Sequence, residues 1–307
     1  MRLAHTLLAV VGAAALSGQS DGPPVGAVAH QAPNPVVHGA DACLPIKFAD
    51  GLPVIPASIA GRSITLGFDT GAPGILHLNK PLVDELKLTQ IGQSRATDPS
   101  GRNVLTLSLY AIQGLKLGQF SIDRWVASGD TPSPNRFANP DGIIGLTAFQ
   151  GYTVTIDYPG RRLLITKGGL PAPDGTSSFH YDGPIPRVPL NIDGHSLEAH
   201  IDSGNSRYAL IVPEGFAARL PNYGERFPIG TAHTVNNKYD LVALPIHDAR
   251  IGKFPLYAGT VAFPGPSETG NVGSQILRDM IVRIDPENSI ISFERAKPGL
   301  EEGCPKA

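Results

Sequence analysis

The stretch PVIPASIAGRSITLGFDTG, from Pro53 to Gly71, returns later in the chain as PRVPLNIDGHSLEAHIDSG, from Pro186 to Gly204. The two stretches align without a gap, so that residue 53 matches residue 186 at a constant offset of 133. Both end in an acid, a hydroxyl residue and glycine. The identical pairs include Pro56/Pro189, Ile59/Ile192, Gly61/Gly194, Ser63/Ser196, Asp69/Asp202 and Gly71/Gly204.

The similarity continues in the same order after each triplet. An apolar strand and a helix-like stretch come next, GILHLNKPLVDELKL in the first copy and RYALIVPEGFAARL in the second. LGQF then matches IGKF, and GIIGLTAFQGYTVTIDYPGRRLLIT matches GNVGSQILRDMIVRIDPENSIISF. Self-similarity in a fixed order indicates a duplicated unit, and this period is far too long for a solenoid. The chain therefore reads as two domain-sized halves.

Composition favours an all-β fold. The 307 residues include 35 glycines and 29 prolines, only 17% are charged, and no long segment has helical periodicity. This mixture is typical of many short strands joined by tight turns. Turns are expected at Gly61-Arg62 and Asp193-Gly194, so each copy forms a hairpin that leads into its aspartate. The net charge of −2 gives no indication of a nucleic-acid or anionic-membrane partner.

The N-terminus resembles an export signal. Arg2 precedes the apolar run TLLAVVGAAAL, which is too short to span a bilayer. Residues 1–18 are therefore predicted to be a signal peptide, although a buried N-terminal helix is the alternative. No cysteine follows the run, so no lipid anchor is expected, and the protein is expected to be periplasmic or secreted. Residues 19–40 are predicted to be a flexible leader.

The domain boundaries follow from the repeat. The first lobe is predicted over residues 41–169, a turn-rich linker over 170–183 and the second lobe over 184–300. Each lobe has a further hairpin, one with a turn at residues 98–101 and one with a turn at Asn236-Asn237. The only cysteines, Cys43 and Cys304, lie at the two ends of the folded region. In an exported protein they are candidates for one disulfide, and two unpaired thiols are the alternative.

With these motifs the chain resembles the aspartic peptidases, the superfamily of pepsin and the retroviral proteases. The resemblance covers most of residues 44–296, and the helix directly after each triplet is more similar to a retroviral-type lobe. It implies two β-barrel lobes with a cleft between them, Asp69 and Asp202 as the catalytic pair, and Thr70, Gly71, Ser203 and Gly204 as their supporting loops. In the family the hydroxyls of the triplets interlock across the lobe interface. The resemblance also implies a second structural element at Ile143, Ile144 and Gly145 and at Val272 and Gly273.

Paired carboxyls suit peptide hydrolysis for a physical reason. One ionised carboxylate takes a proton from water while its protonated neighbour donates to the carbonyl oxygen. Two carboxylates about 4 Å apart repel by about 4 kcal/mol at an effective dielectric near 20, so the pair keeps one shared proton over a wide acid range. The expected function is an aspartic endopeptidase that acts on peptides or proteins without a cofactor. One chain supplies both halves, so a monomer is expected.

The residues also leave a second hypothesis, a catalytically inactive peptide-binding protein on the same fold. The residue after the triplet is Ala72 in the first copy and Asn205 in the second, where the family usually has a small or hydroxyl residue. The first-lobe hairpin also lacks the tyrosine of pepsin-like flaps. His195, Glu198 and His200 precede Asp202, but their spacing is not that of a helical zinc motif, so no metal site is predicted.

Overall fold

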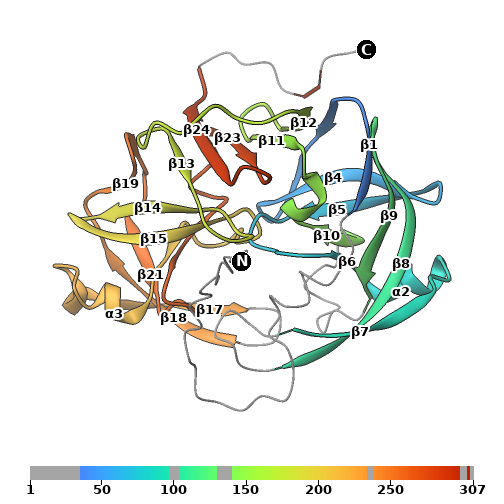
Figure 1. Ribbon diagram of the computed structural model, residues 1–307. Helices are drawn as coiled ribbons and strands as arrows, with labels where there is room; N and C mark the ends of the chain where they lie inside the picture. Colours follow the sequence, from blue (N-terminus) through green and yellow to red (C-terminus); the bar gives the residue numbers. More distant parts are fainter. Residues whose placement is uncertain (1–34, 97–103, 130–139, 234–237, 298–302, 305–307) are drawn as a thin grey trace, which may run out of the picture.

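The computed structural model describes residues 35–96, 104–129, 140–233, 238–297 and 303–304, and within these ranges the protein is all-β. Three sheets account for the strands (Figure 1). Two short α-helices are described, α2 (Lys80–Glu85) and α3 (Glu214–Ala217), with two 3-10 turns, η1 (Leu146–Phe149) and η2 (Tyr223–Glu225). No helix in the described ranges has the length and apolar character needed to cross a membrane.

The first nine-stranded sheet holds the first triplet. Its strand order is β1-β9-β6-β10-β5-β4-β8-β7, with β3 paired to β4. The long strand β8 pairs with both β4 and β9, so this sheet closes on itself. The described strands are β1 (Val36–Gly39), β3 (Lys47–Ala49), β4 (Leu52–Ile59), β5 (Arg62–Phe68), β6 (Leu76–Leu78), β7 (Gln90–Ala96), β8 (Leu105–Leu117), β9 (Phe120–Ser128) and β10 (Gly142–Ile144).

The second nine-stranded sheet holds the second triplet, with the order β17-β18-β21-β16-β22-β15-β14-β19-β20. Its centre repeats the pairing of the first sheet. β10 runs parallel to β5 and antiparallel to β6, and likewise β22 runs parallel to β15 and antiparallel to β16. The strands are β14 (Arg187–Ile192), β15 (His195–Asp202), β16 (Leu210–Ile211), β17 (Phe227–His233), β18 (Lys238–Pro245), β19 (Ala249–Ile251), β20 (Phe254–Pro255), β21 (Thr260–Phe263) and β22 (Gly270–Gly273).

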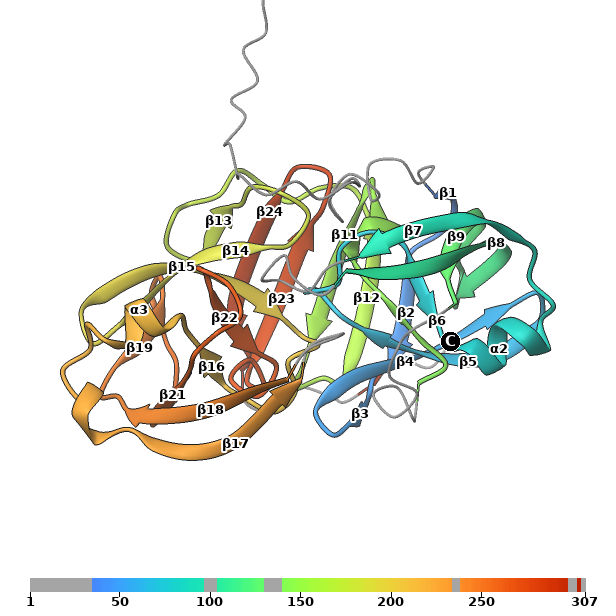
Figure 2. The same ribbon diagram turned by 90° about the horizontal axis from the view of Figure 1, so that it is seen from below.

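A six-stranded sheet draws its strands from both halves of the chain, in the order β13-β24-β23-β11-β12-β2. Figure 2 shows β11, β12, β23 and β24 between the two nine-stranded sheets. The pairing of β11 with β23 joins the two halves. The strands are β2 (Ala42–Pro45), β11 (Tyr152–Asp157), β12 (Arg162–Lys167), β13 (Ser178–His180), β23 (Met280–Asp285) and β24 (Ile290–Arg295).

The hairpins that lead into the aspartates have matching turns. Ala60 and Gly61 have φ values of +50° and +83°, and Asp193 and Gly194 have +47° and +80°. Two successive positive φ angles are typical of the tight hairpin turn whose twist matches the strands on either side. The first turn therefore lies at Ala60-Gly61, one residue before the expected Gly61-Arg62, because Arg62 already belongs to β5.

Two segments near the ends of the described residues are attached to the sheets, one by strand pairing and one by a disulfide. Val36–Gly39, expected within the flexible leader, forms β1 and pairs antiparallel with the edge of β9. Pairing with an edge uses backbone groups, so its Pro- and Gly-rich surroundings do not prevent it. Cys43 on β2 and Cys304 form a disulfide, with 2.02 Å between the sulfur atoms. The predicted signal peptide and the two hairpin turns at 98–101 and Asn236-Asn237 lie outside the described residues.

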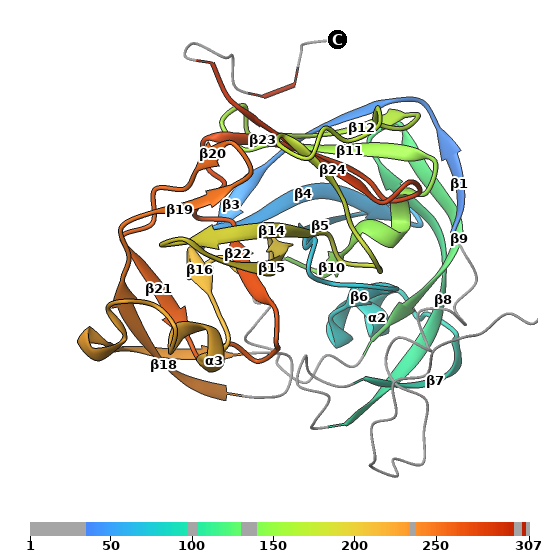
Figure 3. The same cartoon turned by 60° about the vertical axis from the view of Figure 1, so that its left-hand side comes forward.

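One hydrophobic core runs through all three sheets. It takes in fully buried side chains from β4 and β5, from β11 and β23, and from β15 and β22. Figure 3 shows where these strands lie in the three sheets. Alternation along the strands produces this core, as in β14, where Val188, Leu190 and Ile192 are buried between partly or fully exposed neighbours. Each buried side chain of this size contributes about 1.5 to 3 kcal/mol relative to exposure to water. The ends of β5 and β15 are therefore held on a rigid base.

Candidate active site

The two aspartates occupy equivalent places in the two nine-stranded sheets. Asp69 directly follows β5, and Asp202 is the last residue of β15. The strands β10 and β22, which contain the second predicted element, run in parallel beside them. The amide N–H of Asp69 donates to the carbonyl oxygen of Ile144 at 3.0 Å. The predicted neighbours Ile143, Ile144 and Val272 are buried in these strands, next to the triplets.

The carboxyl of each aspartate packs against the glycine of the other triplet. A Cβ atom added to Gly71 would lie 2.6 Å from Oδ1 of Asp202, and one added to Gly204 would overlap the carboxyl of Asp69. A side chain at either glycine would therefore displace the opposite acid, which explains why each triplet ends in glycine. Each carboxyl therefore lies against the opposite triplet, although the two aspartates are 133 residues apart in sequence. Both aspartates are half-buried, so solvent reaches the pair.

The hydroxyl residues of the triplets bind each other reciprocally. The amide N–H of Thr70 donates to Ser203 Oγ, and the amide N–H of Ser203 donates to Thr70 Oγ1, each at 2.9 Å. The Thr70 hydroxyl then donates to the carbonyl oxygen of Ile201 at 2.6 Å, and the Ser203 hydroxyl donates to that of Phe68 at 2.8 Å. Both side chains are buried, so loss of a hydroxyl leaves backbone groups without partners inside the protein. The interlock fixes the distance between the two loops.

The glycines of the second element allow another close approach. A Cβ atom at Gly145 would overlap the carbonyl oxygen of Ala72, and one at Gly273 would overlap that of Tyr208. Each glycine therefore lets its strand pass directly against the segment that follows the triplet. The predicted catalytic residues and those predicted to support them thus lie around Asp69 and Asp202.

Several N–H groups point at the carboxylates. Oδ1 of Asp69 accepts a hydrogen bond from the amide of Gly71 at 2.8 Å. Oδ1 of Asp202 accepts two, from the amides of Gly204 at 2.9 Å and Asn205 at 3.0 Å. Oδ2 of Asp202 accepts a third, from Nδ2 of Asn271 at 2.6 Å. Hydrogen bonds of this kind favour the ionised form of a carboxyl.

Sequence reasoning missed Asn271. It lies within the GNVG element and matches Ile143 of the first copy. The strand register gives the same match, because Ile143 pairs with Gly67 and Asn271 pairs with His200, which is the position that corresponds to Gly67 in the repeat. The sequence does contain a signal for this residue, because a side-chain amide stands at a position that is apolar in the other copy. A comparison of the two repeats, position by position, would have found it.

His200 belongs to a polar group beside the second acid. Its Nε2 accepts a hydrogen bond from Nε of Arg187 at 2.9 Å and lies 3.4 Å from Thr269 Oγ1. Burial and the Arg187 charge lower the pKa of His200, and the Asp202 charge partly opposes them. A ring nitrogen that accepts from arginine is unprotonated, so His200 is neutral here. Among the described residues no three His, Cys, Asp or Glu side chains gather in a way that would hold a metal ion.

Tyr158 is a second residue that the sequence did not single out. Its side chain is buried and stacks on Phe48, with 6.1 Å between the ring centroids. Its hydroxyl has no hydrogen-bond partner among the described residues. Burial raises the pKa of Tyr158, and the negative charges of Asp202 and Asp69 raise it further. The hydroxyl therefore lies within electrostatic range of both acids, and it stays protonated.

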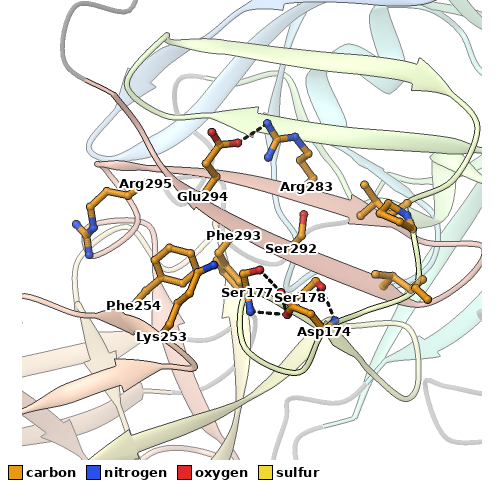
Figure 4. A pocket seen from close by; sticks show the side chains of 14 residues that line it. Asp174, Ser177, Ser178, Lys253, Phe254, Arg283, Ser292, Phe293, Glu294 and Arg295 are labelled. Carbon is orange, nitrogen blue, oxygen red and sulfur yellow. Dashed lines mark hydrogen bonds and ion pairs between the residues drawn. The ribbon is translucent and has the colours of Figure 1, made fainter.

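A pocket lies away from the acids, on the six-stranded sheet and the 170–178 segment (Figure 4). Its volume is about 480 Å³. Asp174 accepts hydrogen bonds from the hydroxyl of Ser177 and from the amides of Ser177, Thr176 and Ser178, and these bonds lower its pKa. Arg283 pairs with Glu294 at 2.8 Å. Asp174 thus stabilises its own turn, and the Arg283–Glu294 pair joins strands β23 and β24. The pocket therefore does not compete with the aspartate pair as a candidate active site.

The chain was compared with models of known protein families and with curated proteins, and neither comparison gives a match.

Proposed function

We propose that this protein is an aspartic endopeptidase in which Asp69 and Asp202 together activate a water molecule. The observation that carries the proposal is the reciprocal packing of each carboxyl against the opposite glycine, fixed by the Thr70–Ser203 interlock. Two acids that each pack against the other's triplet, in a half-buried site, suit the sharing of one proton. The resemblance of both triplets to the catalytic motif of the aspartic peptidases supports the same reaction.

The proposed reaction needs no group beyond the pair and water. The ionised carboxylate takes a proton from water as the water oxygen attacks the carbonyl carbon of the peptide. The protonated carboxyl gives its proton to the carbonyl oxygen, which forms a neutral tetrahedral diol. When the diol collapses, a proton passes to the peptide nitrogen, the C–N bond breaks, and an acid and an amine leave. The backbone N–H groups of Gly71 and Gly204 hold the carboxyls in place through these steps.

We further propose that the protein is exported and works as a monomer on peptide or protein substrates. The disulfide between Cys43 and Cys304 supports an oxidising compartment, because such bonds are rare in reducing ones. Both aspartates come from one chain, so a second copy is not needed to complete the pair. The second candidate is a peptide-binding protein without hydrolysis, which the hydrogen bond from Asn271 to Asp202 favours, since it already engages Oδ2 of the second acid.

The test is hydrolysis of a denatured protein mixture between pH 3 and pH 7. We expect cleavage by the wild-type protein and none by Asp69→Asn or Asp202→Asn. Asp123→Asn is the matched control, because Asp123 is an exposed carboxyl on β9 whose ion-pair partner among the described residues is the exposed His38. Melting temperatures of all variants are measured together, and those of the two site variants should stay close to wild type. Cleavage that survives in either site variant contradicts the proposal, and no cleavage by a folded wild type favours the peptide-binding alternative.

A further inference from the structure

We propose that Arg187 is a specificity-determining residue, which binds an acidic side chain of the peptide substrate beside the aspartate pair. This role rests on the proposed function, and it names the class of substrate that the site prefers. Three features of the molecule carry it. They are a row of polar side chains next to Asp202, the unoccupied donors of the Arg187 guanidinium, and the apolar character of the matching row in the first half.

A row of polar side chains crosses three neighbouring strands on the face of the sheet that bears Asp202. Arg187 on β14 pairs in register with His200 on β15, and His200 pairs with Asn271 on β22. His200 and Asp202 are two residues apart, so their side chains lie on the same face of β15. The residue between them, Ile201, is buried in the core on the other face. Each member of the row is partly exposed, so the row borders the second acid on the side that solvent reaches.

The backbone of Arg187 lies close to the second acid. Asp202 is the diagonal neighbour of Arg187 across the β14–β15 pair, and such neighbours are about 7 to 8 Å apart, within reach of a long side chain. An extended peptide advances by about 3.3 Å per residue. A substrate side chain within about two residues of the cleaved bond can therefore reach the Arg187 guanidinium.

One nitrogen of the Arg187 guanidinium is held in place, and the other two have no partner in the described part of the chain. Nε donates to Nε2 of His200 at 2.9 Å, and this bond orients the plane of the guanidinium. The two Nη atoms form neither a hydrogen bond nor an ion pair with any described residue. They are the end of the planar fork that binds a carboxylate through two parallel hydrogen bonds. The fork is therefore available to a carboxylate that comes from another molecule.

The carboxylates of the surrounding elements leave the positive charge of Arg187 unpaired. Glu198 stands two residues before His200 on β15, and Glu268 lies shortly before β22; both are exposed. Neither of them, nor Asp202, forms an ion pair with Arg187 within the described ranges. His200 is neutral, because its Nε2 accepts from Arg187. The guanidinium thus presents a full positive charge beside the acids.

The first half has no cation at the equivalent place. The matching row is apolar and consists of Val54, Gly67 and Ile143. Val54 and Ile143 are buried, and neither an aliphatic side chain nor glycine can donate a hydrogen bond from a side chain. The duplication thus supplies two equivalent backbones, and only the second carries a group for a carboxylate. The preference for an acidic side chain is therefore expected on one side of the cleaved bond alone.

The experiment is the digestion of a peptide library, with the products identified by mass spectrometry. Every peptide is capped at both ends, so that side chains carry the only carboxylates. At about pH 6 glutamate is ionised, and we expect cleavage to favour glutamate over glutamine about tenfold at one position near the cleaved bond. At about pH 3 glutamate is protonated, so the ratio should fall to about one. The ratio compares two substrates at the same pH, so the titration of the aspartate pair cancels.

Three variants test whether Arg187 is the source of the preference. Arg187→Gln should remove it at about pH 6, and Arg187→Glu should replace it by a preference for lysine. His200→Leu removes the acceptor of Nε and leaves the charge, so it should weaken the preference without abolishing it. Arg250→Gln is the matched control, because Arg250 is an exposed arginine on β19 of the same sheet that pairs with Asp248, and it should keep the preference.

The outcomes separate the role of Arg187 from the proposed function. If the wild type cleaves peptides without an acidic preference, or if Arg187→Gln keeps that preference, the role of Arg187 is wrong while the proposed function stands. Should Arg187→Gln fail to fold, Arg187→Lys takes its place. Lysine keeps the charge but lacks the planar fork, so the ratio should fall several-fold, and an unchanged ratio overturns the role of Arg187.

A binding measurement decides the case in which the wild type cleaves nothing. The same library is passed over immobilised wild-type protein and over immobilised Arg187→Gln protein. Glutamate enriched among the peptides bound by the wild type alone would support the role of Arg187 and overturn the proposed function. Equal enrichment on both proteins, or none on either, would overturn both.

Discussion

Replacing Thr70 by valine tests the interlock between the two triplets. The change keeps the shape of the side chain and removes a hydroxyl that accepts from the Ser203 amide at 2.9 Å and donates to the Ile201 carbonyl at 2.6 Å. Two hydrogen bonds are lost, and a buried N–H and a buried C=O lose their partner. Each such loss costs about 1 to 2 kcal/mol, so we expect about 3 kcal/mol of destabilisation in total. For a chain of this size, with an unfolding entropy of about 2.1 cal/mol/K per residue, that is about 5 °C in melting temperature.

The assay is thermal unfolding with two reference variants. Thr70→Ser keeps the hydroxyl, as the second triplet does with Ser203, and should lie within about 1 kcal/mol of wild type. Thr153→Val removes a buried hydroxyl that donates to one partner, the carbonyl oxygen of Gly168 at 2.8 Å, and should cost only about 1 kcal/mol. If Thr70→Val unfolds no earlier than Thr153→Val, or if Thr70→Ser is as damaging as Thr70→Val, the interlock does not hold the loops in the way described.

Three further changes probe the site and its surroundings. Gly204→Ala should destabilise the protein by about 2 kcal/mol or more, because the new Cβ overlaps the carboxyl of Asp69. Gly215→Ala in helix α3 has open space for the Cβ and should be neutral or stabilising by up to about 1 kcal/mol. Equal free energies of unfolding in urea for the two variants would contradict this. Burial lowers the pKa of His77 to about 4, so the unfolded chain binds a proton before the folded chain does as the pH falls from about 6.5 to 4. The free energy of unfolding should therefore drop by up to about 3 kcal/mol in that range. His77→Gln should flatten the dependence of the unfolding free energy on pH, and an unchanged dependence would count against the buried neutral ring. Tyr158→Phe removes a buried hydroxyl that has no described partner and should change the melting temperature by less than about 3 °C, so a larger loss would show that the hydroxyl makes an essential bond.

The repeat made much of this fold predictable. An offset of 133 residues relates residues 53–71 to residues 186–204, the later motifs recur in the same order, and the strand pairings around the two triplets match. The all-β class is confirmed, because glycine, proline and alternating apolar residues act locally on each strand and turn. The clustering of Asp69 and Asp202 depends on the pairing of distant segments, and only the duplication made that pairing visible.

The features that sequence reasoning missed depend on tertiary contacts. β1 forms because the edge of β9 offers backbone partners, which the composition of Val36–Gly39 does not reveal. The hydrogen bond from Asn271 to Asp202 depends on the register of Asn271 opposite His200. The burial of Tyr158 depends on its packing against Phe48. The close approach of carboxyl to glycine is a further case, since glycine alone indicates only backbone freedom.

The most direct test of the central claim is a carbon-13 NMR titration of both side-chain carboxyls, Asp69 and Asp202, in the wild-type protein. If the two acids share one proton, two well-separated midpoints are expected, and both carboxyl signals should respond at both steps. Two signals that each follow a single midpoint near that of a free aspartate, without response to each other, would show that the carboxyls act independently and would contradict the account.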